Sequence, residues 1–209
     1  MQKTMPRVRA KRKTGNEFVE SDSETLLGFW QWAYSDLLTN LTRSALAEYL
    51  VALDLGLAKG IRQEWASCDL VLMEKKTIRI EVKSSAYLQA WGQDRLSRIV
   101  FNISVAHGWN PNTNQMTKRR QRNSHVYVFC TLTHKDKRTV NPLDPKQWEF
   151  YVLPTKTINS RIPKQTTLTL GSLKTLNPIV AKFGEIREAI IASAGNGDVL
   201  GKYMSAKCL

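Results

Sequence analysis

The stretch IRIEVKSSAY, residues 78–87, alternates apolar and charged residues over its first half. Side chains two residues apart on a strand point to the same face. This alternation predicts a strand with one face buried in a sheet. A solvated outer face and a catalytic one would both explain an acid two residues before a lysine, and the rest of the chain distinguishes them. The two faces hold Ile78, Ile80 and Val82 on one side and Arg79, Glu81 and Lys83 on the other.

Length and charge limit the classes of protein to consider. The chain has 209 residues, 42% of them hydrophobic, with a formal net charge of +13, so its surface attracts polyanions, either nucleic acid or an anionic membrane. Residues 1–14 hold several basic residues and no acid, which predicts a basic, disordered tail. We expect residues 15–209 to form a single domain.

Cysteine usage and hydropathy indicate a cytoplasmic protein. Cys68, Cys130 and Cys208 are odd in number and far apart, which suits a reducing compartment and argues against a disulfide scaffold. No window approaches the ~18 uninterrupted apolar residues of a membrane-spanning helix, so we expect no membrane partner. No GxxxxGK[ST] run is present, so we expect no nucleotide cofactor.

Hydrophobic periodicity predicts an α/β fold with a central mixed sheet flanked by helices. Ser21 and Glu24 have capping-box spacing, Thr42 is a candidate cap for the second helix, and Gly56 is a candidate stop. A polar, basic segment at 104–124 is predicted to be a long loop. The predicted helices are 24–39, 42–56, a short turn at 86–91, and 177–195; the predicted strands are 61–65, 69–73, 78–83, 97–103, 125–132 and 147–154.

Asp69 begins a strand that leads through a tight connection into the strand of Glu81 and Lys83, which predicts a hairpin. A connection of three or five residues would place Asp69 on the face of Glu81, and one of four residues would turn it away. Two neighbouring carboxylates are stable as anions around a cation, and hard oxygen ligands suit Mg²⁺. A lysine beside them can hold an attacking water or stabilise charge on a phosphate.

Glu48 lies on the second predicted helix, where its neighbours three and four positions away are small and mostly apolar. An unpaired charge on such a stripe is costly. Two interpretations remain open. Either Glu48 pairs with a lysine or arginine or lies at the edge of the stripe, or it points from the helix toward the same metal site.

The pattern D-x(11)-E-x-K, formed by Asp69, Glu81 and Lys83 after a helix bearing Glu48, resembles the PD-(D/E)XK nuclease superfamily over about residues 42–132. That resemblance implies a restriction-endonuclease-like core. It also implies a catalytic Mg²⁺, with Mn²⁺ as a possible substitute, held by Asp69, Glu81 and Val82. Gln89 matches a glutamine that members often carry after the E-x-K strand. The sequence departs from the pattern where Cys68, and no proline, precedes the aspartate.

The resemblance implies a Mg²⁺-dependent DNA endonuclease that is site- or structure-specific, of restriction type, and a homodimer because one such site cuts one strand. A basic run in the 104–124 loop is expected to contact DNA phosphates. The alternative is a catalytically inactive nuclease-fold subunit that binds DNA within a larger assembly. The cations of the basic run are Lys118, Arg119, Arg120 and Arg122.

Overall fold

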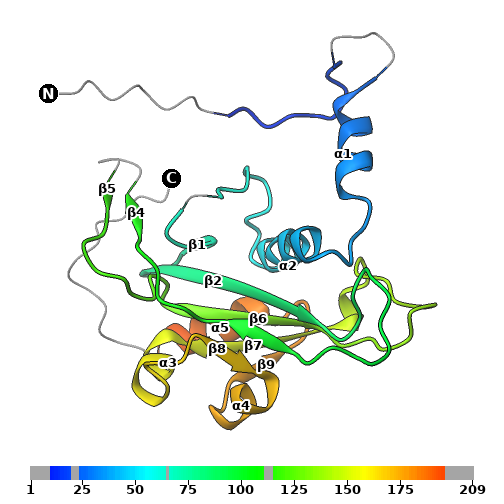
Figure 1. Cartoon of the computed structure of the whole chain (residues 1–209). Helices are drawn as coiled ribbons and strands as arrows, with labels where there is room; N and C mark the ends of the chain where they lie inside the picture. The colour runs from blue at the N-terminus through cyan, green and yellow to red at the C-terminus, as the bar shows by residue number, and fades with distance from the viewer. Residues whose placement is uncertain (1–9, 20–23, 65, 111–114, 196–209) are drawn as a thin grey trace, which may run out of the picture.

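A five-stranded mixed sheet forms the centre of the molecule, and helices lie on both of its faces (Figure 1). The computed structural model describes residues 10–19, 24–64, 66–110 and 115–195. β2 pairs parallel with β6, and the other neighbours pair antiparallel. This confirms the predicted α/β class. In spatial order the strands are β1 (Leu70–Met73), β2 (Thr77–Ala86), β6 (Val126–Leu132), β7 (Trp148–Pro154) and β9 (Ile179–Ala181).

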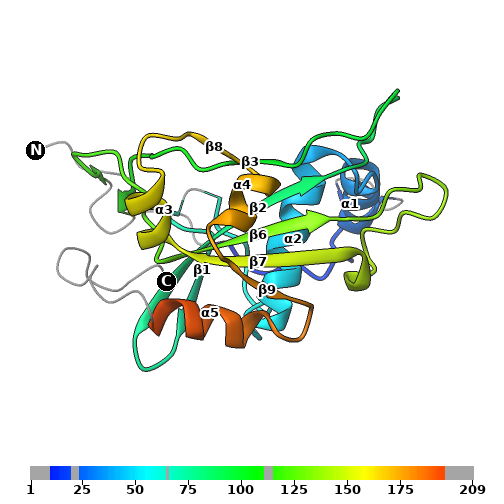
Figure 2. The same cartoon turned by 90° about the horizontal axis from the view of Figure 1, so that it is seen from below.

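The alternation of β2 divides the core into two clusters. Ile78, Ile80 and Val82 face α2 (Asn40–Asp54) and α5 (Ile186–Gly195), where they form the first cluster with residues of both helices. The opposite face of the sheet packs its aromatic side chains, among them Phe129, into the second cluster. That cluster is covered by α3 (Thr155–Arg161), α4 (Leu170–Thr175) and a two-stranded sheet of β3 (Val100–Asn102) and β8 (Thr167–Thr169) (Figure 2).

The two N-terminal helices differ from their predicted bounds at their ends. α1 spans Leu26–Tyr34 and is capped by Thr25, so it is shorter than the predicted helix. Thr39, rather than Thr42, caps α2, because its hydroxyl accepts the Thr42 backbone N–H at 3.3 Å. Gly56 follows α2 at φ 71°, a left-handed conformation that glycine adopts without strain, and ends it as predicted.

Four segments fold differently from the sequence prediction. No strand forms at 61–64, and residue 65 lies outside the described residues. Residues 87–91 are irregular rather than helical, because β2 continues to Ala86. The strand predicted at 97–103 is confined to β3. The predicted C-terminal helix begins only at Ile186, because the residues before it form β9, which pairs with β7.

Residues 104–110 and 115–124, from the segment predicted to be a loop, form a narrow β-arm instead. β4 (Trp109–Asn110) pairs with β5 (Gln115–Met116), and a bridge between Ala106 and Gln121 closes the base of the arm. The arm stands out from the end of the sheet at which β2 begins (Figure 1). The sequence showed no strand period here because each strand is only two residues long.

The basic N-terminal tail lies mostly outside the described residues, which begin at residue 10. Within its described part, the Arg12 guanidinium donates to the Lys59 carbonyl at 2.7 Å. A short 3₁₀ helix, η1 (Pro145–Gln147), leads into β7. Cys68 and Cys130 are buried, and neither forms a disulfide. Among the described residues, no helix combines the length and the apolar character needed to span a bilayer.

Candidate active site

Asp69 directly precedes β1, next to the first pair of the β1–β2 hairpin. The connection is three residues long, from Glu74 to Lys76, and Leu70 pairs with Ile80. The Asp69 backbone N–H donates to the carbonyl of Ile80, the partner of Leu70, at 3.0 Å, so Asp69 and Leu70 both lie against Ile80. Asp69 nevertheless lies close enough to Glu81 and Lys83 for their charges to act on its carboxyl group.

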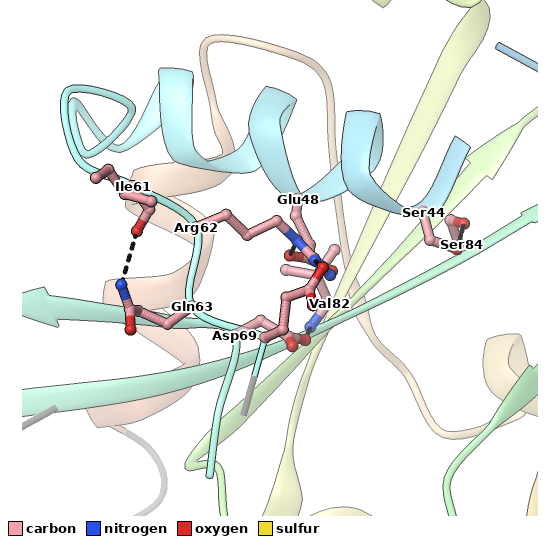
Figure 3. A network of polar contacts seen from close by, with 9 residues as sticks. Ser44, Glu48, Ile61, Arg62, Gln63, Asp69, Val82 and Ser84 are labelled. Carbon is pink, nitrogen blue, oxygen red and sulfur yellow. Dashed lines mark hydrogen bonds and ion pairs between the residues drawn. The ribbon is translucent and has the colours of Figure 1, made fainter. Parts of the chain in front are cut away.

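The side chain of Asp69 also forms a hydrogen bond to the backbone of β2. Its Oδ2 accepts the backbone N–H of Val82 at 2.7 Å (Figure 3). The N–H and C=O of one strand residue point to the same side, so the Val82 carbonyl also faces the Asp69 edge of the sheet. Carboxylate and carbonyl oxygens from two strands thus converge at the point where β1 begins.

Glu81 is held by two partners. The Lys83 ammonium donates to its Oε1 at 2.6 Å, and the Ser124 hydroxyl donates to its Oε2 at 3.1 Å. The side chains of Glu81 and Lys83 remain 21% and 29% exposed, so a ligand can reach them from solvent. Ser124 was missed by the sequence analysis. Its contact depends on the β2–β6 pairing across 43 residues, for which the sequence carries no local signal.

The acids at this edge destabilise one another in the absence of a cation. Burial, and next the charge of Glu81, raises the pKa of Asp69 to about 7. Burial acts to lower the pKa of Lys83, but the charges of Glu81, Asp69 and Glu48 outweigh it and raise that pKa. Lys83 therefore stays protonated beside Glu81, whereas Asp69 ionises fully only above neutral pH or beside an added positive charge.

Glu48 pairs with an arginine, which is one of the two interpretations that the sequence left open. Arg62 Nε and Nη2 donate to the two Glu48 carboxylate oxygens at 2.6 and 2.8 Å, in a bidentate geometry. The pair lies beside the Asp69–Val82 contact (Figure 3), and the Glu48 charge contributes to raising the pKa of Asp69. Arg62 comes from the irregular segment between α2 and β1, so its role was not visible as a periodic signal.

Gln89 is buried, and its side-chain hydrogen bonds go to Arg43 and Ala86 and not to the acid pair of Asp69 and Glu81. Its side-chain carbonyl accepts from Arg43 Nη1 at 3.2 Å, and its amide donates to the Ala86 carbonyl at 3.0 Å. Arg43 itself is buried on α2 and also donates to the Leu38 carbonyl. Gln89 therefore ties the end of β2 to the start of α2.

Of the four basic residues predicted to contact DNA, three are exposed and one is buried. Lys118, Arg119 and Arg120 are exposed, and Arg120 donates to the Val105 carbonyl at the base of the arm. Arg122 is only 6% exposed, which corrects its assignment as a phosphate contact. Its guanidinium is occupied by four acceptors from other segments: the carbonyls of Ile103, Pro163 and Gln165 and the side-chain oxygen of Asn159.

The oxygen donors at the hairpin fit a hard divalent cation better than a transition metal. Among the described residues, no group of three or more His, Cys, Asp and Glu side chains is arranged to hold a metal ion. A cation here would rely on the carboxylates of Asp69 and Glu81 and the carbonyl of Val82, with water completing its shell. This all-oxygen set is one that Mg²⁺ accepts, because Mg²⁺ commonly keeps several waters and binds through one or two carboxylates.

Comparison with known proteins gave one similar structure. No family model and no curated protein matches this chain. Among solved structures, that of a bacterial homing endonuclease is similar, with 18% sequence identity and a TM-score of 0.34. The similarity covers 61% of this chain and 74% of that one.

Proposed function

We propose that this protein is a metal-dependent DNA endonuclease of the PD-(D/E)XK type that hydrolyses phosphodiester bonds in the cytoplasm. The observation that supports the proposal is that the Asp69 carboxylate accepts the backbone N–H of Val82, the residue between Glu81 and Lys83, whose side chains bond one another. The raised pKa of Asp69 supports it, because a buried acid pair that is unstable as two anions is a common feature of functional sites.

Asp69, Glu81 and the Val82 carbonyl are the groups we assign to holding Mg²⁺, which Mn²⁺ could replace. The bound ion would supply Lewis-acid stabilisation of the phosphate and a more acidic water. Lys83 contributes its own charge. Its ammonium is partly exposed and fixed at 2.6 Å from Glu81, so it can orient a water or stabilise charge developing on a phosphate oxygen.

Glu48 and Arg62 are assigned to a supporting role at this site. Arg62 fixes the Glu48 carboxylate in one orientation, and their charges act on Asp69 in opposite senses. Loss of Glu48 would free Arg62 and alter the field at the acid pair. Gln89, which contacts Arg43 and not the acids, is assigned to positioning α2 relative to β2.

DNA is the substrate that the charge distribution favours. The net charge of +13 favours binding to a polyanion, and the exposed arm residues Lys118, Arg119 and Arg120 offer phosphate contacts. Because the arm rises at the end of the sheet where β2 begins, it can approach DNA bound at the hairpin (Figure 1). We expect cleavage at specific sites or structures, since an arm of this kind adds a recognition surface to the core.

The test is cleavage of plasmid DNA in Mg²⁺, followed by mapping of the DNA ends. We expect nicked or linear product from the native protein, none in excess EDTA, and none from Glu81→Ala. Each variant should keep its circular dichroism spectrum and its DNA affinity, because these groups act on the transition state more than on binding. Full cleavage by Glu81→Ala, or cleavage unchanged by EDTA, would refute the proposal.

A second candidate, an inactive DNA-binding subunit with this fold, is favoured by one observation. The acids Glu48 and Glu81 already have cationic partners within the chain, Arg62 and Lys83, so the folded protein has partial charge compensation without a metal. The same assay separates the two functions. DNA binding in a mobility-shift assay, without cleavage in Mg²⁺ or Mn²⁺, would support the inactive subunit.

A further inference from the structure

Two loops lie against one another at the end of the sheet where β2 and β6 stop. Lys137 Nζ of the second loop donates to the Trp91 carbonyl of the first at 2.9 Å. Lys135 Nζ, also of the second loop, lies 5.0 Å from the centre of the Tyr87 ring at the start of the first. The two loops therefore form one surface. The first loop follows β2 and the second follows β6, at residues 87–99 and 133–144.

Cations without an acid partner gather on this surface. Four of them are exposed, and none forms an ion pair with any residue that the structure describes. A fifth cation, Arg138, pairs with Asp136 of its own loop, and Asp94 is the other acid on the two loops. Positive charge therefore exceeds negative charge here. We call the four unpaired residues the end-loop cations: Arg95, Arg98, Lys135 and Lys137.

Several cations elsewhere on the molecule do have acid partners. Lys182 Nζ at the end of β9 lies 3.4 Å from Glu149 Oε1 on β7, and Arg187 of α5 pairs with Glu74 on the turn between β1 and β2. Those charges are compensated within the chain. The end-loop cations instead repel one another in the free protein, and a bound polyanion would relieve that repulsion.

β2 runs from the arm to these loops and carries the candidate active site between them. Near its start, the Arg79 carbonyl accepts the His125 backbone N–H at 2.8 Å, and Arg79 Nε donates to the Asn123 carbonyl at 2.8 Å, so the arm joins the sheet there. The first loop begins where β2 ends, and Glu81 and Lys83 lie between the two points. Figures 1 and 2 both show the arm and the loops at opposite ends of the sheet.

The separation of the two basic surfaces suits duplex DNA. β2 has ten residues, so it spans ~33 Å at about 3.3 Å per residue. One turn of B-form DNA is about 34 Å long. A duplex that lies along β2 would therefore meet the arm and the end-loop cations about one turn apart. A membrane surface has no such repeat, so the spacing favours DNA as the polyanion.

We propose that the end-loop cations contact DNA phosphates, so that one duplex lies along β2 from the arm to the loops and passes over Glu81 and Lys83. This inference rests on the proposed function in taking DNA as the ligand, but it concerns binding and not cleavage. It makes the two loops a second DNA interface. It also puts duplex on both sides of the candidate active site, which is the arrangement for acting within a duplex rather than at its end.

A salt titration of duplex binding tests the loop contacts. Fluorescence anisotropy in EDTA, with a duplex of about two turns, measures binding without cleavage. In the double variant Arg95→Gln with Lys137→Gln, we expect the slope of log affinity against log salt to flatten by ~1.8, which is ~0.9 for each lost contact. The matched control is Lys174→Gln with Lys182→Gln, which removes the same charge from beside Glu149 on β7 and should keep the native slope.

Three results of this titration would overturn the proposal. The first is a native slope in the loop variant. The second is equal flattening in the loop variant and the control, which would mean that net charge alone sets the affinity. The third is a native slope on DNA together with weaker binding to phosphatidylserine vesicles, which would assign the loops to a membrane surface.

A series of duplex lengths tests whether one duplex spans both surfaces. We expect the affinity of the native protein to rise steeply from about half a turn to about one and a half turns, because only the longer duplexes reach both surfaces. The loop variant and Arg119→Ala on the arm should each lose most of that rise. An equal rise in the native protein and the loop variant would overturn the proposal. The predicted binding pattern without plasmid cleavage would support the loop interface and refute the nuclease function.

Discussion

Two regions of the same sheet use neighbouring residues in opposite ways. In the centre, all seven residues of β6 are buried, and Phe129 packs in the second cluster. At the β1–β2 edge, Lys83, which pairs in register with Phe129, is part of a group of mutually destabilising charges. The centre supplies stability, and the edge retains strained charges, as functional sites commonly do.

The largest effect should come from the centre. Phe129→Ala leaves a cavity in a fully buried aromatic cluster, where Phe129 contacts Phe101 and Tyr127. We expect a loss of about 3–5 kcal/mol in the free energy of unfolding, measured by urea denaturation. Lys83→Ala, its neighbour across the strands, is the control and should lose little stability. An equal loss in both variants would erase the distinction between the two regions.

At the β1–β2 edge, a substitution should change the cleavage rate more than the stability. Lys83→Ala removes a charge from the proposed site of phosphodiester hydrolysis, and we expect the single-turnover cleavage rate to fall by about 10²–10³. The measurement is single-turnover cleavage at saturating Mg²⁺, beside urea denaturation of the same preparation. A normal rate would show that Lys83 serves only to neutralise Glu81.

The Glu48–Arg62 pair should have an intermediate effect. Glu48→Gln keeps the size of the side chain and removes its charge, and we expect cleavage about 10–100-fold slower. Glu64→Gln is a matched control, because Glu64 also contacts Arg62, at 3.1 Å, but its side chain is 71% exposed. If both variants cut at the native rate, the pair is purely structural.

The arm allows the same comparison on a smaller scale, because the exposed Arg119 and the buried Arg122 lie three residues apart. Arg119→Ala should flatten the slope of log affinity against log salt by ~0.9 on duplex DNA, with stability unchanged. Arg122→Ala should lower stability, because four acceptors lose their donor. Salt titrations of binding and urea denaturation of both variants provide the measurements, and interchanged outcomes would contradict the assignment.

The sequence was informative where one period dominates a segment. The alternation in β2 predicted which residues of that strand face the core, and the E-x-K spacing predicted that Glu81 and Lys83 share a face. Apolar runs also identified β6 and β7 to within a residue or two. In these segments, the hydrophobic pattern and the local backbone preference agree.

The sequence was less informative where a partner distant in the chain decides the structure. The run before Gly184 has helical character, yet it pairs with β7 and becomes β9. Arg122 cannot be told from Arg119 by sequence, because its acceptors come from 103 and from 159–165. The hairpin register depends on a turn of three rather than four residues, a difference that the composition of the turn does not encode.

Binding of Mn²⁺ to the DNA-free protein, followed by electron paramagnetic resonance, tests most directly whether the acid pair is a metal site. Protons compete for Asp69, whose pKa is raised to about 7, so affinity should weaken as the pH falls below that value. We predict binding by the native protein at about pH 8 that is at least tenfold weaker in Asp69→Asn. Equal affinity in the two proteins, with no dependence on pH, would contradict the account.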